Sequence, residues 1–257
     1  MSTPYFDDGQ VTLYLGDCRE VLPTLAITAD LICTDPPYGE TSLAWDRWVD
    51  GWPTLAALAA RSLWCFGSMR MFLEHGTEFT GAGWKLSQDI VWEKNAGTGL
   101  TNDRFKRIHE HAVHWYLGAW GDARHETPRI RHLGPNQGQV RHSKTDVPHY
   151  GGTRANVWSD DGKRLMTSVI YSKNMKGRAL HPTEKPLAVL DPLIHYACPP
   201  GGLVLDLFAG SGATLDAARQ AGRRAVGIEG DERYAEAAAK RLSQPVLDFG
   251  SGPADAA

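Results

Sequence analysis

The stretch Thr34-Asp-Pro-Pro-Tyr-Gly39 constrains the fold of this chain more than any other. An apolar run from Ala29 to Cys33, interrupted only by Asp30, precedes it and predicts a short buried strand. Two consecutive prolines cannot extend that strand, because proline has no N–H to donate and its φ is fixed. The chain must therefore leave the sheet at Asp35, with a carboxylate, a carbonyl and an aromatic ring close together. In open α/β sheets, ligands bind at this carboxyl edge.

The rest of the chain alternates between predicted strands and helices, which calls for a largely parallel sheet with helices on both faces. A polar loop is predicted for residues 93–99, between two apolar strands. The further predicted strands cover residues 11–15, 62–66, 84–92, 111–117, 202–208 and 224–228. The predicted helices cover residues 18–26, 52–63, 69–76, 187–197, 214–221 and 232–242.

Between residues 118 and 180 this periodicity fades, and the segment is rich in Gly, His, Arg, Asn and Ser. A structureless loop of that length is improbable within a compact domain, so we expect a small inserted unit or a segment ordered by its partner. From Gly121 to His181 eleven Lys and Arg face five Asp and Glu, a balance of +6 in a chain of net charge −3. A local basic surface on an acidic body suits a partner with a phosphate backbone, although an ordinary solvated face has the same composition.

A second chemical centre follows the predicted strand that ends near Asp206. Phe208-Ala-Gly-Ser-Gly212 forms a glycine turn before a helix, and glycines let a ligand approach the backbone closely. The next strand ends in Glu229, where an acid suits a ribose diol. Leu215 stands where a third glycine would complete GxGxxG, so an adenosine ligand without a pyrophosphate fits as well as a dinucleotide or better.

At this point the motifs together resemble the S-adenosylmethionine-dependent amino-methyltransferases of DNA. Asp35-Pro-Pro-Tyr38 precedes His181-Pro-Thr-Glu-Lys-Pro186 and then the glycine motif, an order similar to the beta group of that family. Trp92-Glu-Lys-Asn-Ala-Gly97 and His109-Glu-His111 also resemble its middle motifs. The resemblance implies a Rossmann-like α/β methyltransferase fold, circularly permuted. It assigns residues 1–117 and 181–245 to the catalytic domain, 118–180 to target recognition and 246–257 to a flexible tail.

The resemblance also implies roles for single residues. Asp35 and the Pro36 carbonyl would accept the two amino hydrogens of the target base, Pro37 would keep the turn rigid, and Tyr38 would stack on a base that has left the DNA helix. S-adenosylmethionine would contact Asp17, Asp35, Thr183, Lys185, Asp206, Phe208, Ala209, Gly210, Gly212, Thr214 and Glu229. Double-stranded DNA would contact Arg129, Arg131, Arg141, Lys144 and Arg154 in the basic segment.

The usual sheet of such enzymes has a third strand beyond the one that ends in Glu229, yet here the chain ends soon after that residue. We therefore expect residues 11–15 to supply the missing strand, parallel to and beside 224–228. Asp17 would then lie at its carboxyl end, next to the adenine of the cofactor.

Several classes of protein are disfavoured by composition. No long apolar run or secretion signal occurs, and four widely spaced cysteines without a CxxC pair predict a reduced cytoplasmic protein with no membrane partner. The cysteines, with Cys198-Pro199 in reverse order, do not suggest the covalent adduct of C5-cytosine methyltransferases; we interpret them as small buried residues. We expect no metal, because His109, His111 and His114 lack a convincing fourth ligand.

The alternatives within this interpretation stay open. Asp before Pro-Pro-Tyr goes mostly with adenine N6 in the resembling family, and a Ser there mostly with cytosine N4, so we expect adenine. Cytosine N4, an RNA amino group, a silent DNA-binding protein and, less favoured, a nicotinamide oxidoreductase are the alternatives. Methylation of a glutamine side chain is disfavoured, because the enzymes that methylate glutamine usually carry Asn in place of Asp35. A homodimer and a cognate nuclease of a restriction-modification system are also open.

Overall fold

The computed structural model describes residues 2–98, 103, 105–131, 163–173 and 184–244. The chain divides into two compact units. The first comprises Met1–Glu126 with Ser168–Ala257, and the second comprises Thr127–Thr167. In the second unit β7 (Arg129–Arg131) pairs antiparallel with β8 (Lys163–Leu165). The tail predicted for residues 246–257 lies outside the described residues.

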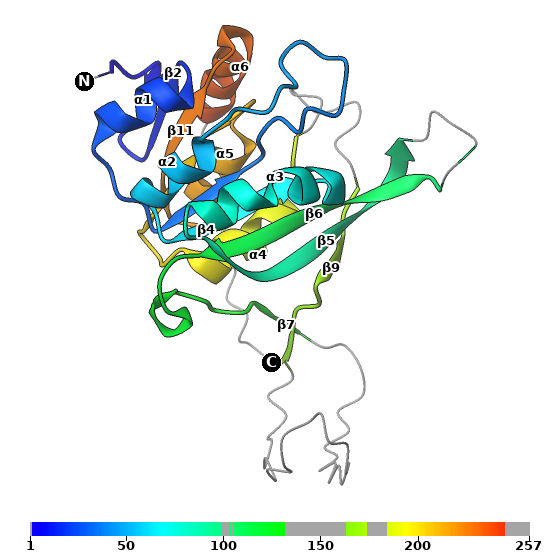
Figure 1. The fold of residues 1–257 in the computed structure, drawn as a ribbon. Helices are drawn as coiled ribbons and strands as arrows, with labels where there is room; N and C mark the ends of the chain where they lie inside the picture. The colour runs from blue at the N-terminus through cyan, green and yellow to red at the C-terminus, as the bar shows by residue number, and fades with distance from the viewer. Residues whose placement is uncertain (1, 99–102, 104, 132–162, 174–183, 245–257) are drawn as a thin grey trace, which may run out of the picture. The chain divides into compact units, whose positions relative to one another are not determined.

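The first unit contains a nine-stranded mixed sheet (Figure 1). In spatial order its strands are β1 (Phe6–Asp7), β2 (Val11–Leu15), β11 (Arg224–Glu229), β10 (Leu203–Asp206), β3 (Leu31–Thr34), β4 (Ser62–Gly67), β6 (Arg107–Tyr116), β5 (Lys85–Thr98) and β9 (Val169–Tyr171). The run from β2 to β4 is parallel throughout. β6 is antiparallel to both of its neighbours, and β9 pairs parallel with β5. β9 thus belongs to the main sheet, although it lies within the segment 118–180.

Strand β2 completes the parallel sheet as the motif order predicts. It runs parallel to β11, with Val11 opposite Ala225 and Leu15 opposite Glu229. The N–H of Gly16 donates to the Glu229 carbonyl at 2.8 Å and extends the ladder to the carboxyl end. The prediction that residues 11–15 replace the missing third strand is therefore confirmed, and Asp17 follows at that edge.

Helices cover both faces of the sheet, which confirms the predicted α/β architecture (Figure 1). α1 (Cys18–Leu25), α2 (Trp52–Ala59) and α3 (Met69–Gly81) lie on one face; α4 (Leu187–Ala197), α5 (Ala213–Gln220) and α6 (Glu232–Leu242) lie on the other. Because both faces are covered, every residue of β3 and β4 is buried, which explains why both strands are mostly apolar, with Thr34 and Ser62 as the polar exceptions. None of the described helices has the length and apolarity that crossing a membrane requires.

Several predicted boundaries are wrong. Helix α2 ends at Ala59 rather than at residue 63, and β6 begins at Arg107 rather than at residue 111. The loop expected over residues 93–99 is strand as far as Thr98, where β5 pairs with Arg107 of β6 after a register shift. Pairing with a neighbouring strand does not require apolar side chains. The polar sequence of this segment therefore lacks the alternation of apolar residues by which a strand is usually predicted. Helix α3 continues past Gly76 to Gly81, because Phe79 is fully buried and its burial outweighs the cost of about 1 kcal/mol for a helical glycine.

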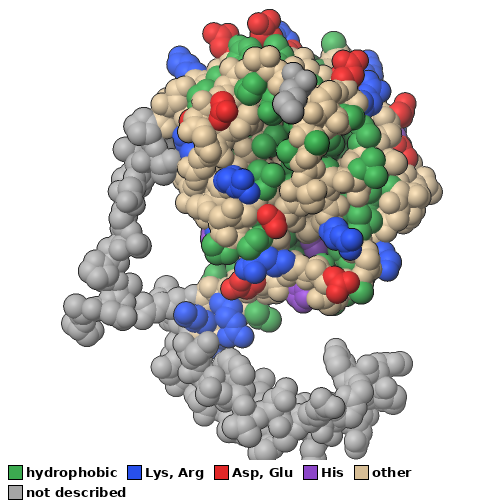
Figure 2. Space-filling model, turned by 90° about the vertical axis from the view of Figure 1, so that its left-hand side faces the viewer, with side chains coloured by type: hydrophobic (Ala, Val, Ile, Leu, Met, Phe, Trp, Pro, Cys, Tyr) green, Lys and Arg blue, Asp and Glu red, His purple; other side chains and the backbone are tan. Residues whose placement is uncertain are grey.

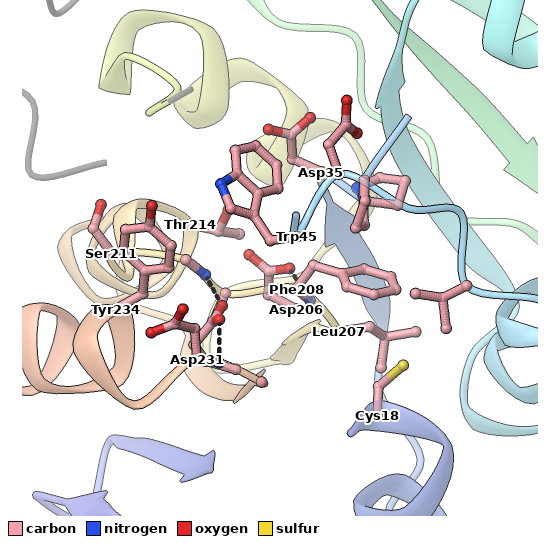
Figure 3. Close-up of a pocket in the computed structure, with 18 of the residues that line it drawn as sticks. Cys18, Asp35, Trp45, Asp206, Leu207, Phe208, Ser211, Thr214, Asp231 and Tyr234 are labelled. Carbon is pink, nitrogen blue, oxygen red and sulfur yellow. Dashed lines mark hydrogen bonds between the residues drawn. The ribbon is translucent and has the colours of Figure 1, made fainter. Parts of the chain in front are cut away.

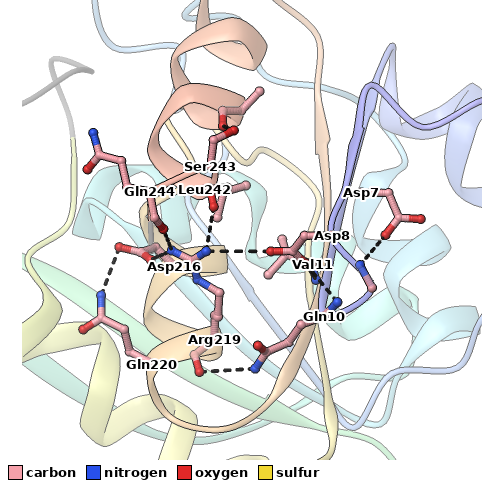
Figure 4. A network of polar contacts seen from close by, with 12 residues as sticks. Asp7, Asp8, Gln10, Val11, Asp216, Arg219, Gln220, Leu242, Ser243 and Gln244 are labelled. Carbon is pink, nitrogen blue, oxygen red and sulfur yellow. Dashed lines mark hydrogen bonds and ion pairs between the residues drawn. The ribbon is translucent and has the colours of Figure 1, made fainter. Parts of the chain in front are cut away.

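Arg219 binds the end of α6, the last helix among the described residues, to α5 and to the segment beyond β1 (Figure 4). Arg219 of α5 is 9% exposed, and its guanidinium donates to the carbonyls of Leu242 at 2.6 Å and Gln244 at 3.2 Å. The same group pairs with Asp216 at 2.8 Å and with Asp8, beyond β1, at 3.7 Å. These contacts satisfy carbonyls that the end of α6 would otherwise leave without donors.

Candidate active site

The two predicted centres meet at the carboxyl ends of the neighbouring strands β3 and β10. The Thr34 hydroxyl, at the end of β3, donates to Asp206 Oδ1 at 2.7 Å, and the N–H of Phe208 donates to the same oxygen at 3.1 Å. Asp206 is 2% exposed, and burial raises its pKa to about 6. The hydrogen bond between the strands therefore joins the Asp-Pro-Pro-Tyr turn to the glycine motif.

A cavity of about 670 Å³ opens at this edge, and side chains from the turn after β3, from the end of β10 and from the start of α6 converge on it (Figure 3). Its lining includes most of the residues that the sequence proposed, namely Asp17, Asp35, Pro36, Pro37, Tyr38, Lys185, Asp206, Phe208, Ala209, Gly210, Thr214 and Glu229. Gly212 is not part of the lining. Its φ is +77°, and a Cβ added there would lie 3.0 Å from the Cβ of Ala238, so it lets α5 begin close to α6. Thr183 lies outside the described residues.

Acids at the carboxyl ends of β11 and β2 line one part of the cavity. Glu229 accepts from the N–H of Gly210 at 2.6 Å through Oε2 and from the N–H of Asp231 at 2.8 Å through Oε1. These bonds fix the carboxylate beside the glycine turn, while burial raises its pKa. Asp17 caps the N-terminus of α1 and binds the guanidinium of Arg19, whose hydrogen bond lowers the pKa of Asp17.

The Asp-Pro-Pro-Tyr turn supplies another part of the wall. The Tyr38 hydroxyl donates to Asp35 Oδ1 at 2.6 Å, and the Lys185 ammonium pairs with Asp35 Oδ2. Burial, reinforced by the charge of Asp35, raises the pKa of the Tyr38 phenol well above its usual range. Burial alone would lower the pKa of Lys185, but the carboxylates of Asp35 and Glu110 outweigh it and raise that pKa. Lys185, which we expected to bind the cofactor, thus contacts the predicted catalytic acid.

Several residues of the site were missed by sequence reasoning. Trp45, Asp46, Glu184, Ser211, Asp231 and Tyr234 also line the cavity. Asp46 is buried and accepts from the N–H groups of Gly39 at 2.8 Å and Thr41 at 2.7 Å, which closes the loop after the prolines. An aspartate a few residues after a glycine turn could have signalled this role. Glu184 and Ser211 stand within the His181–Pro186 and glycine motifs, where the sequence assigned them no role, and Trp45, Asp231 and Tyr234 lie in no motif considered above.

Glu184 links three distant segments at the cavity. It accepts from the Ser211 hydroxyl at 3.0 Å and pairs with Arg241 of α6 at 2.7 Å. The segment before α4 is thereby held against the glycine motif. The His181–Pro186 motif and the glycine motif lie close together in sequence, but this did not reveal the contacts of Glu184. The ion pair with Arg241 depends on how α6 packs.

The cysteines and His114 occupy buried positions. All four cysteines are buried, as expected, and burial raises the pKa of Cys18, which lines the cavity, to about 12. Its thiol is therefore protonated at neutral pH and unsuited to nucleophilic attack. The His114 Nε2 atom lies 2.9 Å from the Ser62 hydroxyl in the sheet. Among the described residues no three His, Cys, Asp or Glu side chains are grouped closely enough to hold a metal ion.

The predicted DNA-binding residues are only partly described. Arg129 and Arg131 are register partners of Leu165 and Lys163 in the β7–β8 ribbon of the second unit. Arg141, Lys144 and Arg154 lie outside the described residues. On the face that Figure 2 presents, acidic and basic side chains are interspersed.

Comparison with known proteins decides the family. A model of the DNA methylase family, which groups the N6 and N4 amino-methyltransferases, matches residues 29–240. The chain belongs to that family. The resemblance inferred from the motifs is confirmed, and with it S-adenosylmethionine as the methyl donor of the family.

Individual relatives agree with the family match. The type II methyltransferase M2.LlaDCHI of Lactococcus lactis subsp. cremoris is 25% identical over 95% of this chain and 93% of its own length. YubD of Escherichia coli (strain K12) is 31% identical over 89% of this chain and 88% of its own.

Solved structures show the same fold. M1.HpyAVI, in a complex with S-adenosylmethionine, is 23% identical with a TM-score of 0.63 over 90% of this chain and 100% of its own. The cytosine-N4-specific PvuII DNA methyltransferase is 14% identical with a TM-score of 0.66 over 96% of this chain and 91% of its own. The fold is therefore shared with a cytosine-N4-specific enzyme and does not by itself indicate the target base.

Proposed function

We propose that this methylase transfers a methyl group from S-adenosylmethionine to N6 of adenine in a specific sequence of double-stranded DNA. The observation that carries the proposal is that Asp35 lines one continuous cavity with the glycine motif and Glu229. A predicted acceptor for an amino group and a predicted nucleoside site thus open into the same space. Asp35, Pro36, Pro37 and Tyr38 are proposed as the catalytic residues.

The cavity residues fit the cofactor. A volume of about 670 Å³ is within the usual range for small-molecule sites. Glu229 is fixed by two backbone N–H groups and has lone pairs left for a ribose diol. Gly210, at φ +52°, lets the backbone approach a ligand closely. When bound, S-adenosylmethionine supplies an electrophilic methyl group on a sulfonium.

The residues around Asp35 would act on the target base. An exocyclic amino nitrogen is a poor nucleophile, because its lone pair is delocalised into the ring. Acceptors for both N–H bonds, the Asp35 carboxylate and the Pro36 carbonyl, draw the nitrogen toward tetrahedral geometry. Tyr38 offers its ring to the extruded base. Catalysis then rests on positioning and electrostatics, and the amino group keeps its protons until it has attacked.

Adenine is preferred over cytosine because Asp35 stands first in the tetrapeptide, as in most adenine-specific members that the chain resembles. A carboxylate is a strong acceptor for an amino hydrogen, but this property alone does not choose a base. The fold does not choose either, since the cytosine-N4-specific PvuII enzyme shares it. Cytosine N4 is therefore the second candidate.

The test is to incubate the methylase and S-adenosylmethionine with bacterial DNA from a strain without DNA methylases, then digest the DNA to nucleosides for mass spectrometry. We expect N6-methyldeoxyadenosine, and none from the Asp35→Ala variant. N4-methyldeoxycytidine alone would overturn the choice of base and leave the transfer reaction standing. No methylated nucleoside from a folded enzyme that binds the cofactor would overturn the proposed activity.

We also propose that the segment 118–180 recognises the DNA. Its support is the balance of +6 over residues 121–181 and the basic residues of the β7–β8 ribbon. Reversing the charge at Arg129 and Arg131 should weaken DNA binding and lower the slope of log K against log salt by about one for each phosphate that the protein no longer neutralises. Cofactor affinity should not change. If DNA affinity and slope both survive, the basic balance belongs to a solvated face.

A further inference from the structure

Four charged side chains form a continuous chain that ends at the predicted catalytic acid. Lys94 of β5 pairs with Glu110 Oε1 of β6, and Glu110 Oε2 lies 3.4 Å from the Lys185 ammonium. Lys185 in turn pairs with Asp35 Oδ2. Lys94 and Glu110 lie near each other because Trp92 is the register partner of Glu110, and the Lys94 ammonium lies 4.5 Å from the Trp92 ring centroid.

The four charged side chains differ in their surroundings. Asp35 and Lys185 line the cavity, whereas Glu110 and Lys94 do not and stand behind its wall. The Lys185 side chain is 4% exposed, and its ammonium lies 5.1 Å from the ring centroid of Phe66. Glu110 therefore contacts a residue of the cavity wall through Lys185, and its charge also contributes to the raised pKa of Tyr38.

Stability does not account for such an arrangement. Desolvating charged groups is costly, and well-packed apolar residues of similar volume often serve a fold as well or better. What the four charged side chains do provide is a fixed orientation for the Asp35 carboxylate. Asp35 is held at Oδ1 by the Tyr38 hydroxyl at 2.6 Å and at Oδ2 by Lys185, and Lys185 is held by Glu110.

We propose that Lys185 is a positioning residue for Asp35, and that Glu110, itself fixed by Lys94, positions Lys185. The inference rests on the proposed function and deepens it. The ammonium holds the Asp35 carboxylate in place at the wall of the cavity. It also offsets part of the carboxylate's charge, so that Asp35 accepts a hydrogen bond from the amino group without first removing its proton.

Three variants test this role: Lys185→Met removes the ammonium, Lys185→Arg keeps a cation, and Glu110→Gln keeps the shape behind the wall. The readouts are kcat at saturating substrates, with labelled S-adenosylmethionine and unmethylated bacterial DNA, and the dissociation constants of cofactor and DNA. A misplaced reacting group can cost about 100-fold, so we expect kcat to fall about 10- to 100-fold in Lys185→Met and in Glu110→Gln. Both dissociation constants should stay within about 3-fold of wild type, too small a change to account for that loss. Lys185→Arg should recover part of the loss.

Arg219→Met is the matched control, because it removes a buried cation from a carboxylate partner that lies outside the cavity. It should lower stability and leave kcat per folded molecule unchanged. The double variant Lys185→Met with Glu110→Gln should lose little more than Lys185→Met alone, since both act through one contact.

The outcomes separate this inference from the proposed function. If wild type transfers no methyl group to DNA, the proposed function fails. If wild type is active but Lys185→Met or Glu110→Gln, folded by circular dichroism, keeps wild-type kcat, the positioning role is wrong. A weaker cofactor affinity in Lys185→Met with kcat preserved would instead make Lys185 a cofactor ligand, and would also overturn the role proposed here.

Discussion

Asp206 allows a specific prediction about folding stability, because its buried carboxylate accepts hydrogen bonds from the uncharged hydroxyl of Thr34 and N–H of Phe208. Its pKa is raised to about 6 by burial, against an ordinary value of about 3.9. A difference of about 2 units corresponds to about 3 kcal/mol between the two protonation states. Ionised Asp206 therefore costs the folded protein about 3 kcal/mol, even though Thr34 and Phe208 donate hydrogen bonds to it.

The sign of the pH dependence follows from proton binding. Below about pH 4 the carboxyl is protonated in both states and costs nothing. Between about pH 4 and pH 6 the unfolded chain has lost this proton while the folded protein retains it, so folding stability falls as the pH rises. Above about pH 6 the folded protein has lost it too, and the full cost is present.

Asp206→Asn removes this cost and keeps an oxygen that can accept from Thr34 and Phe208. We expect the variant to match wild type near pH 4 and to exceed it by about 2 to 3 kcal/mol at pH 7.5, in urea unfolding without cofactor. Asp216→Asn is the control: it removes the carboxylate 2.8 Å from buried Arg219 and should lower stability. Parallel stability curves for Asp206→Asn and wild type from pH 4 to 7.5 would refute the reasoning.

Three further outcomes follow from the described contacts. Tyr38→Phe removes a hydrogen bond to a carboxylate, so kcat should fall by about 10-fold; wild-type kcat would show that only the ring matters. Arg219→Met should destabilise the fold by about 3 kcal/mol in urea unfolding, because α6 loses its anchor; a loss below about 0.5 kcal/mol would contradict this. Asp17→Ala should weaken cofactor binding in calorimetry, and unchanged affinity would remove Asp17 from the proposed site.

Much of the site could be predicted from local sequence signals. The prolines after Thr34 and the glycines after Phe208 each end a strand at the carboxyl edge, so their positions follow from backbone chemistry alone. The place of β2 followed from the need for a strand beyond β11, and the register of Val11 with Ala225 confirms it. Such features are set by the backbone and by topology, which leave few alternatives.

The contacts between side chains from distant segments could not be predicted. Lys185 was expected to bind cofactor, and its pairing with Asp35 depends on the path of the chain before α4. Glu110 stands in the His109-Glu-His111 motif without an assigned role, because sequence alone does not show that its side chain reaches Lys185. Its partner Lys94 lies in a segment whose polar composition had indicated a loop.

The order of strands also explains why permutation leaves the site intact. From β10 the sheet grows in one direction through β11 to β2, and from β3 in the other to β4. Helices α5 and α6 cover one face and α1 and α2 the other, so the crossovers diverge between β10 and β3 and leave a crevice at the carboxyl edge. The bond from Thr34 to Asp206 lies at that point. Since β2 still lies against β11, its carboxyl end reaches the same crevice, even though it comes first of these strands in the chain rather than last.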